Sequence, residues 1–246
     1  MSQSGSQSGS QSGSQSDVVV GEVRRRLAQA ADPERAPQMQ AYMKSTMPFR
    51  GVSAVPMRRI CREVFDEYRL PDHDSWRSVV LTLWDEAQFR EERYAAVQLT
   101  GHRHYRDLQD VSTLEMYRHL VGTGAWWDLV DTIASNRVGP ILRAHHDVVT
   151  PMIRAWAVEA DTWVRRTAIL CQLGSKAQTD LDLLRFAIER NLEDSAFGRE
   201  FFIRKAIGWA LREHAKTDEA WVVSFVSVHA DHMSGLSRRE ALKNVG

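Results

Sequence analysis

Hydrophobic residues recur at helical spacing along almost the whole chain from Asp17 onward. Val19, Val23 and Leu27 stand four residues apart, which places their side chains on one face of a helix. The pattern predicts helices over residues 17–31, 36–44, 53–71, 74–84, 89–99, 108–120, 126–134, 138–149, 151–156, 162–173, 181–192, 201–214, 220–228 and 237–245. Residues 221–228 are rich in β-formers, but a lone strand would have no partner. The sequence therefore predicts an all-α fold.

Short turns between these segments indicate stacked antiparallel helix pairs. Successive pairs are spaced roughly 35–45 residues apart, which is typical of HEAT-like repeats and predicts an α-solenoid. The repeats resemble one another only weakly, so the periodicity leaves a non-repetitive helical bundle open. Residues 2–16 repeat serine, glutamine and glycine without charge or apolar groups, so we expect residues 1–16 to form a flexible tail. Residues 17–246 are expected to form a single domain.

Composition narrows the function classes without selecting one. The chain has 32 basic and 32 acidic residues, so nucleic-acid binding can be argued only from where the charges lie. No apolar run reaches the ~18 residues of a membrane span, and we expect no membrane association. The two cysteines form no CxxC motif and are expected to be reduced thiols in a cytoplasmic protein.

The segment Trp126–Asp131 carries two tryptophans and two acids. On a helix that starts after Gly124, Trp126, Val130 and Ile133 share a core-facing stripe. Trp127 and Asp131 stand four residues apart and lie side by side on another face. This pair is either a buried indole beside a capping carboxylate or the start of a functional site.

Two later helices place cations beside tryptophans. Arg166 lies at the edge of an apolar face, where it forms either a structural salt bridge or a phosphate clamp. Trp209 has Lys205 four residues before it and Arg212 three residues after it. That arrangement fits a stacking platform beside phosphates. It fits equally well a tryptophan packed between two helices, with the aliphatic parts of the Lys205 and Arg212 side chains lying along its ring.

Other chemistries have little support in the sequence. The pairs His102/His104 and His145/His146 have no companion Cys, Asp or Glu at metal-like spacing, so we expect no metal and no cofactor. No phosphate-binding glycine loop and no GxSxG motif is present in the sequence.

Five motifs, in order from about Ala36 to the end of the chain, resemble those of the AlkD family of bacterial DNA alkylation-repair glycosylases. They are Tyr42-Met43-Lys44 with Pro48-Phe49-x-Gly51 and Pro56-x-Arg58-Arg59; Trp126-Trp127-Asp128-x-Val130-Asp131; Arg165-Arg166-Thr167-Ala168-Ile169-Leu170-x-Gln172-Leu173; Phe201-Phe202-Ile203-x-Lys205-Ala206-Ile207-Gly208-Trp209-x-Leu211-Arg212-Glu213; and Leu236-Ser237-x-Arg239-Glu240-Ala241.

The resemblance implies a HEAT-like α-solenoid whose basic concave groove wraps duplex DNA and which excises purines alkylated at N3 or N7. It places the catalytic aspartate at Asp131, the two cleft tryptophans at Trp127 and Trp209, and a DNA-contacting arginine at Arg166. Tyr42 falls at the cleft-edge tyrosine of the family.

Basic residues add to this expected DNA surface. Lys44 belongs to a group of cations near Tyr42, and Lys205 and Arg212 are assigned to DNA binding from their spacing alone. The resemblance further implies a monomeric, cofactor-free hydrolase that acts on the N-glycosidic bonds of double-stranded DNA in the bacterial cytoplasm. The alternative is a non-catalytic helical-repeat scaffold or DNA-binding module. The joint presence of Trp127, Asp131, Arg166 and Trp209 argues against that alternative.

Overall fold

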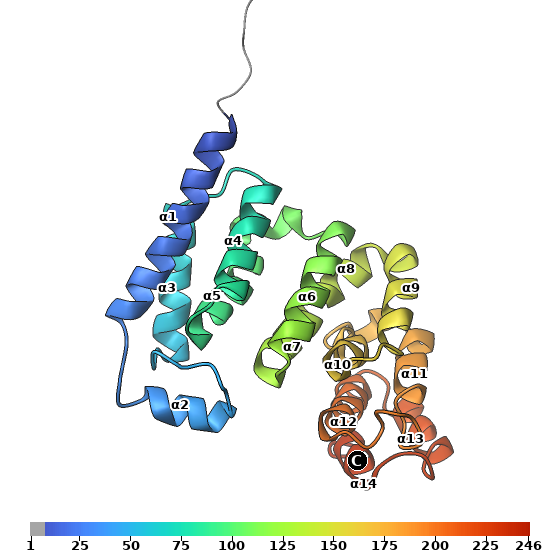
Figure 1. Ribbon diagram of the computed structural model, residues 1–246. Coiled ribbons are helices and arrows are strands. Elements are labelled where there is room, and N and C mark those ends of the chain that lie inside the picture. The colour runs from blue at the N-terminus through green and yellow to red at the C-terminus, as the bar shows by residue number, and fades with distance from the viewer. Residues whose placement is uncertain (1–7) are drawn as a thin grey trace, which may run out of the picture. The chain divides into compact units, whose positions relative to one another are not determined.

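The structure, a computed structural model, describes residues 8–246 of the chain. Within these residues it contains fourteen α-helices and no strand, which confirms the predicted all-α fold (Figure 1). The chain divides into two compact units, Met1–Leu108 and Gln109–Gly246. The single domain expected over residues 17–246 stays a prediction. None of the described helices is both long enough and apolar enough to cross a membrane.

The serine- and glutamine-rich segment at the start of the chain is described only in part. Residues 1–7 of the expected flexible tail lie outside the described residues, and helix α1 (Ser8–Gln29) takes in the rest of that tail. Val19, Val23 and Leu27 are fully buried on one face of α1, as their spacing predicts. The flexibility of residues 1–16 stays a prediction.

The unit Met1–Leu108 is a group of helices packed side by side. It contains α1, α2 (Ala36–Met43), α3 (Ala54–Glu67), α4 (His73–Asp85), α5 (Arg90–Thr100) and the 3-10 helix η1 (Arg103–Leu108). Both α1 and α5 pack against α3 and α4, and α2 lies across one end of the group (Figure 1). Phe65, Trp76 and Trp84 are almost completely buried between these helices and form much of the core.

A buried carboxylate fixes the turn between α2 and α3. The Glu91 side chain accepts hydrogen bonds from the backbone N–H groups of Arg50, Gly51 and Val52, at 2.9 to 3.1 Å. Gly51 has a φ of 83°, and a Cβ there would meet the Asp32 carbonyl oxygen at 2.1 Å, so only glycine fits this turn. Glu91 thereby satisfies backbone donors that would otherwise be buried without partners.

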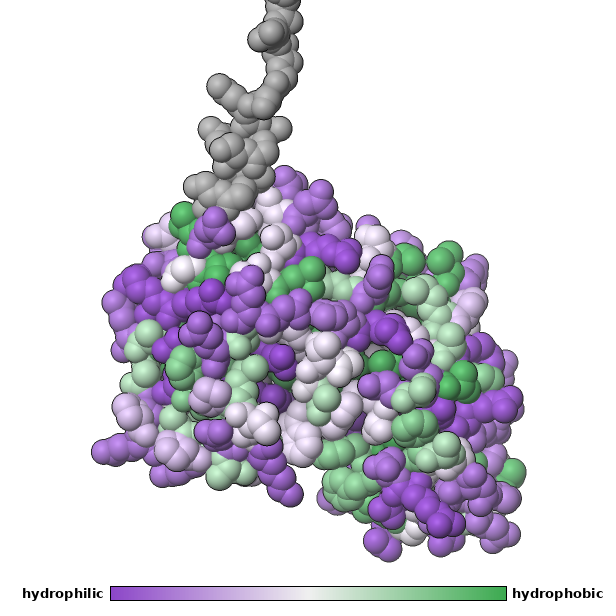
Figure 2. Space-filling view, in the orientation of Figure 1, coloured by the Kyte–Doolittle hydropathy of each residue, from purple (hydrophilic) through white to green (hydrophobic). Residues whose placement is uncertain are grey.

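Hydrophilic side chains gather over the C-terminal half of α1 (Figure 2). Arg24 Nε lies 2.8 Å from Glu92 Oε2, and Arg26 Nη2 lies 2.5 Å from Glu67 Oε2. These ion pairs tie α1 to α5 and α3. The polar face of α1 is therefore linked to its neighbours by charge, while its apolar stripe is packed into the core.

The unit Gln109–Gly246 holds the second group of helices. They are the 3-10 helix η2 (Val111–Thr113), α6 (Leu114–Gly124), α7 (Trp127–Ile133), the π-helix η3 (Ala134–Val138), α8 (Gly139–Ala144), α9 (His146–Trp156), α10 (Thr162–Leu170), the 3-10 helix η4 (Lys176–Gln178), α11 (Leu181–Glu189), α12 (Phe201–Ala215), α13 (Glu219–Val228) and α14 (Gly235–Ala241). Short polar side chains cap the N-termini of several of these helices. Asp161, Asp180, Asp218 and Ser234 each accept a backbone N–H in the first turn of the next helix, at 2.7 to 3.0 Å.

The helix boundaries around Pro151 differ from the predicted ones. The predicted break at Pro151 is wrong: the chain breaks at His145, whose φ of −132° is not helical, and α9 runs through Pro151. Because Pro151 lies only five residues after the start of α9, its missing N–H removes a single intrahelical bond near the helix start. The β-rich segment 221–228 is helical, within α13, as predicted.

Candidate active site

The site is built from α7, α10 and α12, which all belong to the unit Gln109–Gly246. Ala125 adopts a left-handed conformation (φ 42°) and ends α6, so that Trp126 becomes the N-cap residue of α7. Val130 and Ile133 are buried, as predicted. Trp127, on the predicted second face, is 36% exposed. Trp126 itself precedes the helix and is half-buried rather than part of the core stripe.

Asp131 of α7 is held by Arg166 of α10 through two parallel hydrogen bonds. Arg166 Nε donates to Asp131 Oδ1 at 2.7 Å, and Nη2 donates to Oδ2 at 2.9 Å. The third guanidinium nitrogen donates to the backbone carbonyl of Phe202 in α12. The arginine side chain is 5% exposed and the aspartate side chain 15% exposed. The salt bridge that was one of two options for Arg166 is therefore present, and its partner is the predicted catalytic carboxylate.

Burial of Asp131 and its pairing with Arg166 shift the pKa of the carboxyl in opposite directions. Burial raises the pKa of the Asp131 carboxyl above its usual range, although the guanidinium of Arg166 favours the charged form. The two bonds from Arg166 use one lone pair on each carboxylate oxygen, so each oxygen can still accept another bond. The arrangement can thus hold a carboxylate in a fixed orientation and leave it able to bind a water or a cationic group.

Aromatic rings lie next to this ion pair. The rings of Trp126, Trp163 and Phe202 contact one another, with centroids 4.8 to 5.9 Å apart. The Arg166 guanidinium carbon lies 5.7 Å from the centroid of the Phe202 ring. Sequence reasoning missed Phe202, whose carbonyl gives no signal in the sequence. Trp163 did give a signal in the sequence, because it lies three residues before Arg166 on α10 and so on the same side of that helix.

The predicted platform on α12 has an acidic neighbour from α14. Trp209 is half-buried. Lys205 Nζ lies 3.3 Å from Glu240 Oε1, and Arg212 Nη1 pairs with the other carboxylate oxygen. α14 approaches this closely because residue 208 is a glycine: a Cβ there would stand 2.5 Å from the Glu240 Cβ. Both predicted DNA-binding cations therefore have an internal partner, and their contact with DNA stays a prediction.

Tyr42 and Lys44 belong to the other unit. Tyr42 is 76% exposed, and Lys44 ends α2 in a left-handed conformation with a φ of 49°. A tyrosine this exposed makes little contribution to the core. Its assignment to DNA binding stays a prediction, as does that of Lys44.

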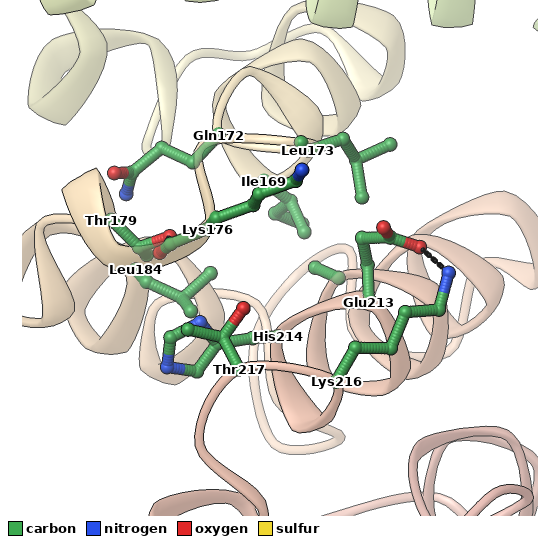
Figure 3. Close-up of a pocket in the computed structure, with 12 residues that line it drawn as sticks. Ile169, Gln172, Leu173, Lys176, Thr179, Leu184, Glu213, His214, Lys216 and Thr217 are labelled. Atoms are coloured by element: carbon green, nitrogen blue, oxygen red, sulfur yellow. Dashed lines mark hydrogen bonds and ion pairs between the residues drawn. The ribbon is translucent and has the colours of Figure 1, made fainter.

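A cavity of about 280 Å³ is lined by side chains from α10, α11, α12 and η4 (Figure 3). His214 is 8% exposed at this cavity, and within the described part of the chain neither of its ring nitrogens has a hydrogen-bond partner. Burial lowers the pKa of His214, which favours the neutral ring. Glu213 and Lys216 pair at 2.6 Å on its rim. None of the predicted site residues lines this cavity.

Comparisons with known proteins agree with the resemblance seen in the motifs. A family model described as DNA alkylation repair enzyme matches residues 23–245. The structure of a predicted DNA alkylation repair enzyme from Enterococcus faecalis superposes with a TM-score of 0.77 at 29% identity, covering 88% of this chain and 97% of that chain. A search among curated proteins found no match.

Proposed function

The chain belongs to the family of DNA alkylation repair enzymes, and on that premise we propose that it is a DNA glycosylase. It hydrolyses the N-glycosidic bond of purines that carry a positive charge after alkylation at N3 or N7 in duplex DNA. The observation that carries this proposal is the Asp131–Arg166 pair, a carboxylate held in one orientation next to aromatic rings.

The reaction needs no metal and no cofactor. A purine alkylated at N3 or N7 is already cationic, so it leaves the sugar as a neutral base. The remaining tasks are to stabilise the oxocarbenium-like sugar and to position a water, and a carboxylate performs both. Asp131 fills this role because two lone pairs on its oxygens remain available beside the bonds from Arg166.

The aromatic residues and Arg166 have supporting roles in this mechanism. Indole faces attract cations by about 0.5–2 kcal/mol per contact, which suits Trp127 and Trp209 to a cationic base or sugar. Neither indole is buried in the core. Arg166 positions Asp131 through its two bonds, and a contact from Arg166 to a DNA phosphate remains part of the proposal.

DNA binding completes the proposal. We place the duplex in a basic concave groove of a HEAT-like α-solenoid, where Tyr42, Lys44, Lys205 and Arg212 contact its backbone. The protein acts as a monomer in the bacterial cytoplasm. Binding through phosphate contacts predicts an affinity that falls steeply with salt, by about one unit of log-log slope per contact.

Release of free purine from damaged DNA tests the proposal against a non-catalytic DNA-binding scaffold. The protein is incubated with methylated duplex DNA and with duplexes that carry uracil, hypoxanthine or ethenoadenine. We expect release of 3-methyladenine and 7-methylguanine only, because the proposed site includes no proton donor that would help a neutral base leave. DNA binding without any base release would establish the scaffold. Release of a neutral base would require an acid that this mechanism lacks.

A further inference from the structure

Three potential metal ligands meet in the unit Met1–Leu108, far along the chain from the carboxylate site. Asp66 lies in the last turn of α3, His102 follows α5, and His104 lies in η1. Asp66 Oδ1 is 2.9 Å from His104 Nε2 and 3.3 Å from His102 Nε2, and the three ligand atoms all lie within 4.8 Å of one another. The spacing of His102 and His104 predicted no metal because Asp66 comes from a distant part of the sequence.

The ring nitrogens of His102 are buried and make no hydrogen bond within the described part of the chain. The side chain is 9% exposed. A buried polar group without a partner costs roughly 1–3 kcal/mol.

Two of the three ligand–ligand distances fit a small divalent cation. With metal–ligand bonds of about 2.0–2.1 Å, the ligand atoms of a tetrahedral site stand about 3.3 Å apart. His102 Nε2 and Asp66 Oδ1 are separated by 3.3 Å, and the 2.9 Å between Asp66 Oδ1 and His104 Nε2 must open only slightly. Two imidazole nitrogens and one carboxylate oxygen are a ligand set used by first-row transition metals.

Neighbouring groups orient the ligands. Arg103 Nη2 donates to Asp66 Oδ2 at 2.9 Å, which leaves Oδ1 directed at the histidines. The Phe65 ring contacts His102 edge-on at 5.7 Å. A hollow of about 340 Å³ reaches one of the three ligands, His102, and its lining also includes Arg103.

We propose that Asp66, His102 and His104 bind one divalent transition-metal ion of the Zn²⁺ class. Three protein ligands leave at least one coordination position for water. The ion joins the C-terminal turn of α3 to η1, which the Arg103–Asp66 bond also links. Its role is to stabilise this unit, independently of the carboxylate site.

Metal titration of the full chain tests this proposal. Co²⁺ is added while visible absorbance is recorded, and Zn²⁺ binding is measured by calorimetry. We expect one equivalent to bind with the intense absorbance of a tetrahedral site, and Zn²⁺ to raise the melting temperature. His104→Ala and His102→Ala should each weaken binding by at least ~10-fold, as expected when a group that supports a metal site is removed.

His146→Ala is the matched control, because His146 also faces carboxylates, Asp180 at 2.9 Å and Asp147 at 3.5 Å, but is exposed. This variant should bind Zn²⁺ like the wild type. The proposal is overturned if the wild type shows no saturable binding at one equivalent. It is equally overturned if His104→Ala, in which the replaced side chain is only 20% exposed, folds normally and binds Zn²⁺ unchanged. Base release from DNA is not needed for either result.

Discussion

Replacing Arg166 by alanine should show how strongly the ion pair stabilises the folded protein with Asp131 charged. In Arg166→Ala the carboxylate, 15% exposed, loses both of its charged donors. Breaking a buried ion pair in this way costs about 3–5 kcal/mol, because an uncompensated charge is left behind. The carboxyl can instead take up a proton. At pH 7 that costs at most ~4 kcal/mol for a group whose unfolded pKa is about 3.9. We therefore expect a loss of about 3–4 kcal/mol in the free energy of unfolding.

The loss in the free energy of unfolding of Arg166→Ala should depend on pH, which distinguishes it from a simple loss of packing. Because a protonated Asp131 is tolerated without Arg166, the folded variant has a raised carboxyl pKa and binds a proton that the unfolded chain releases. The destabilisation should therefore grow as pH rises and shrink on acidification, to about 1.5 kcal/mol for this group at pH 5. Lost packing and the lost bond to the Phe202 carbonyl add about 1 kcal/mol at either pH.

Urea unfolding at pH 5 and pH 7, followed by circular dichroism, measures both values. Arg165→Ala is the matched control: Arg165 is also buried, but it donates to the Val158 carbonyl and the Asn191 side chain rather than to a carboxylate. Its destabilisation should not change between the two pH values. An Arg166→Ala loss that is equally independent of pH, or smaller than about 1 kcal/mol, would refute this account of the pair.

Two further results are expected. Because burial raises the pKa of Asp131, the rate of base release should fall on acidification at a pH above the ordinary aspartate value of about 3.9; a single-turnover pH profile without this acid limb argues against a catalytic carboxylate. Glu240→Gln should free Lys205 and Arg212 and steepen the salt dependence of DNA binding by up to about one unit per new phosphate contact. Glu213→Gln, which frees Lys216 instead, should leave that slope unchanged, and equal slopes in all three proteins would remove both cations from the DNA surface.

The local structure could be predicted because it depends on short spacings. The burial of Val130 and Ile133 on α7 was predicted from their spacing, whereas Trp126, assigned to the same stripe, precedes the helix. The start of α12 at Phe201 was likewise predicted. The predicted break at Pro151 failed because a proline near a helix start removes only one bond, whereas the backbone angle of His145 depends on its surroundings.

The contacts that define the sites could not be predicted, because they join distant segments. Glu240 reaches Lys205 only because Gly208 lets α14 approach α12. The pairing of Arg166 with Asp131 crosses 35 positions of sequence, and nothing in the local spacing chooses this partner over a phosphate. Asp66 meets His104 across 38 positions. Helix spacing and the family resemblance selected the candidate side chains, while their partners emerged only from the packing.

The central claim is that Asp131 performs the chemistry, and the single-turnover rate of 7-methylguanine release from a defined duplex tests it most directly. Asp128→Asn is the matched control, since it removes a carboxylate from the same helix. We predict that Asp128→Asn retains most of the rate, whereas Asp131→Asn loses well over 10-fold at unchanged DNA affinity. A tenfold change corresponds to about 1.4 kcal/mol of barrier. An Asp131→Asn variant that binds DNA and keeps more than about a tenth of the wild-type rate would contradict the claim.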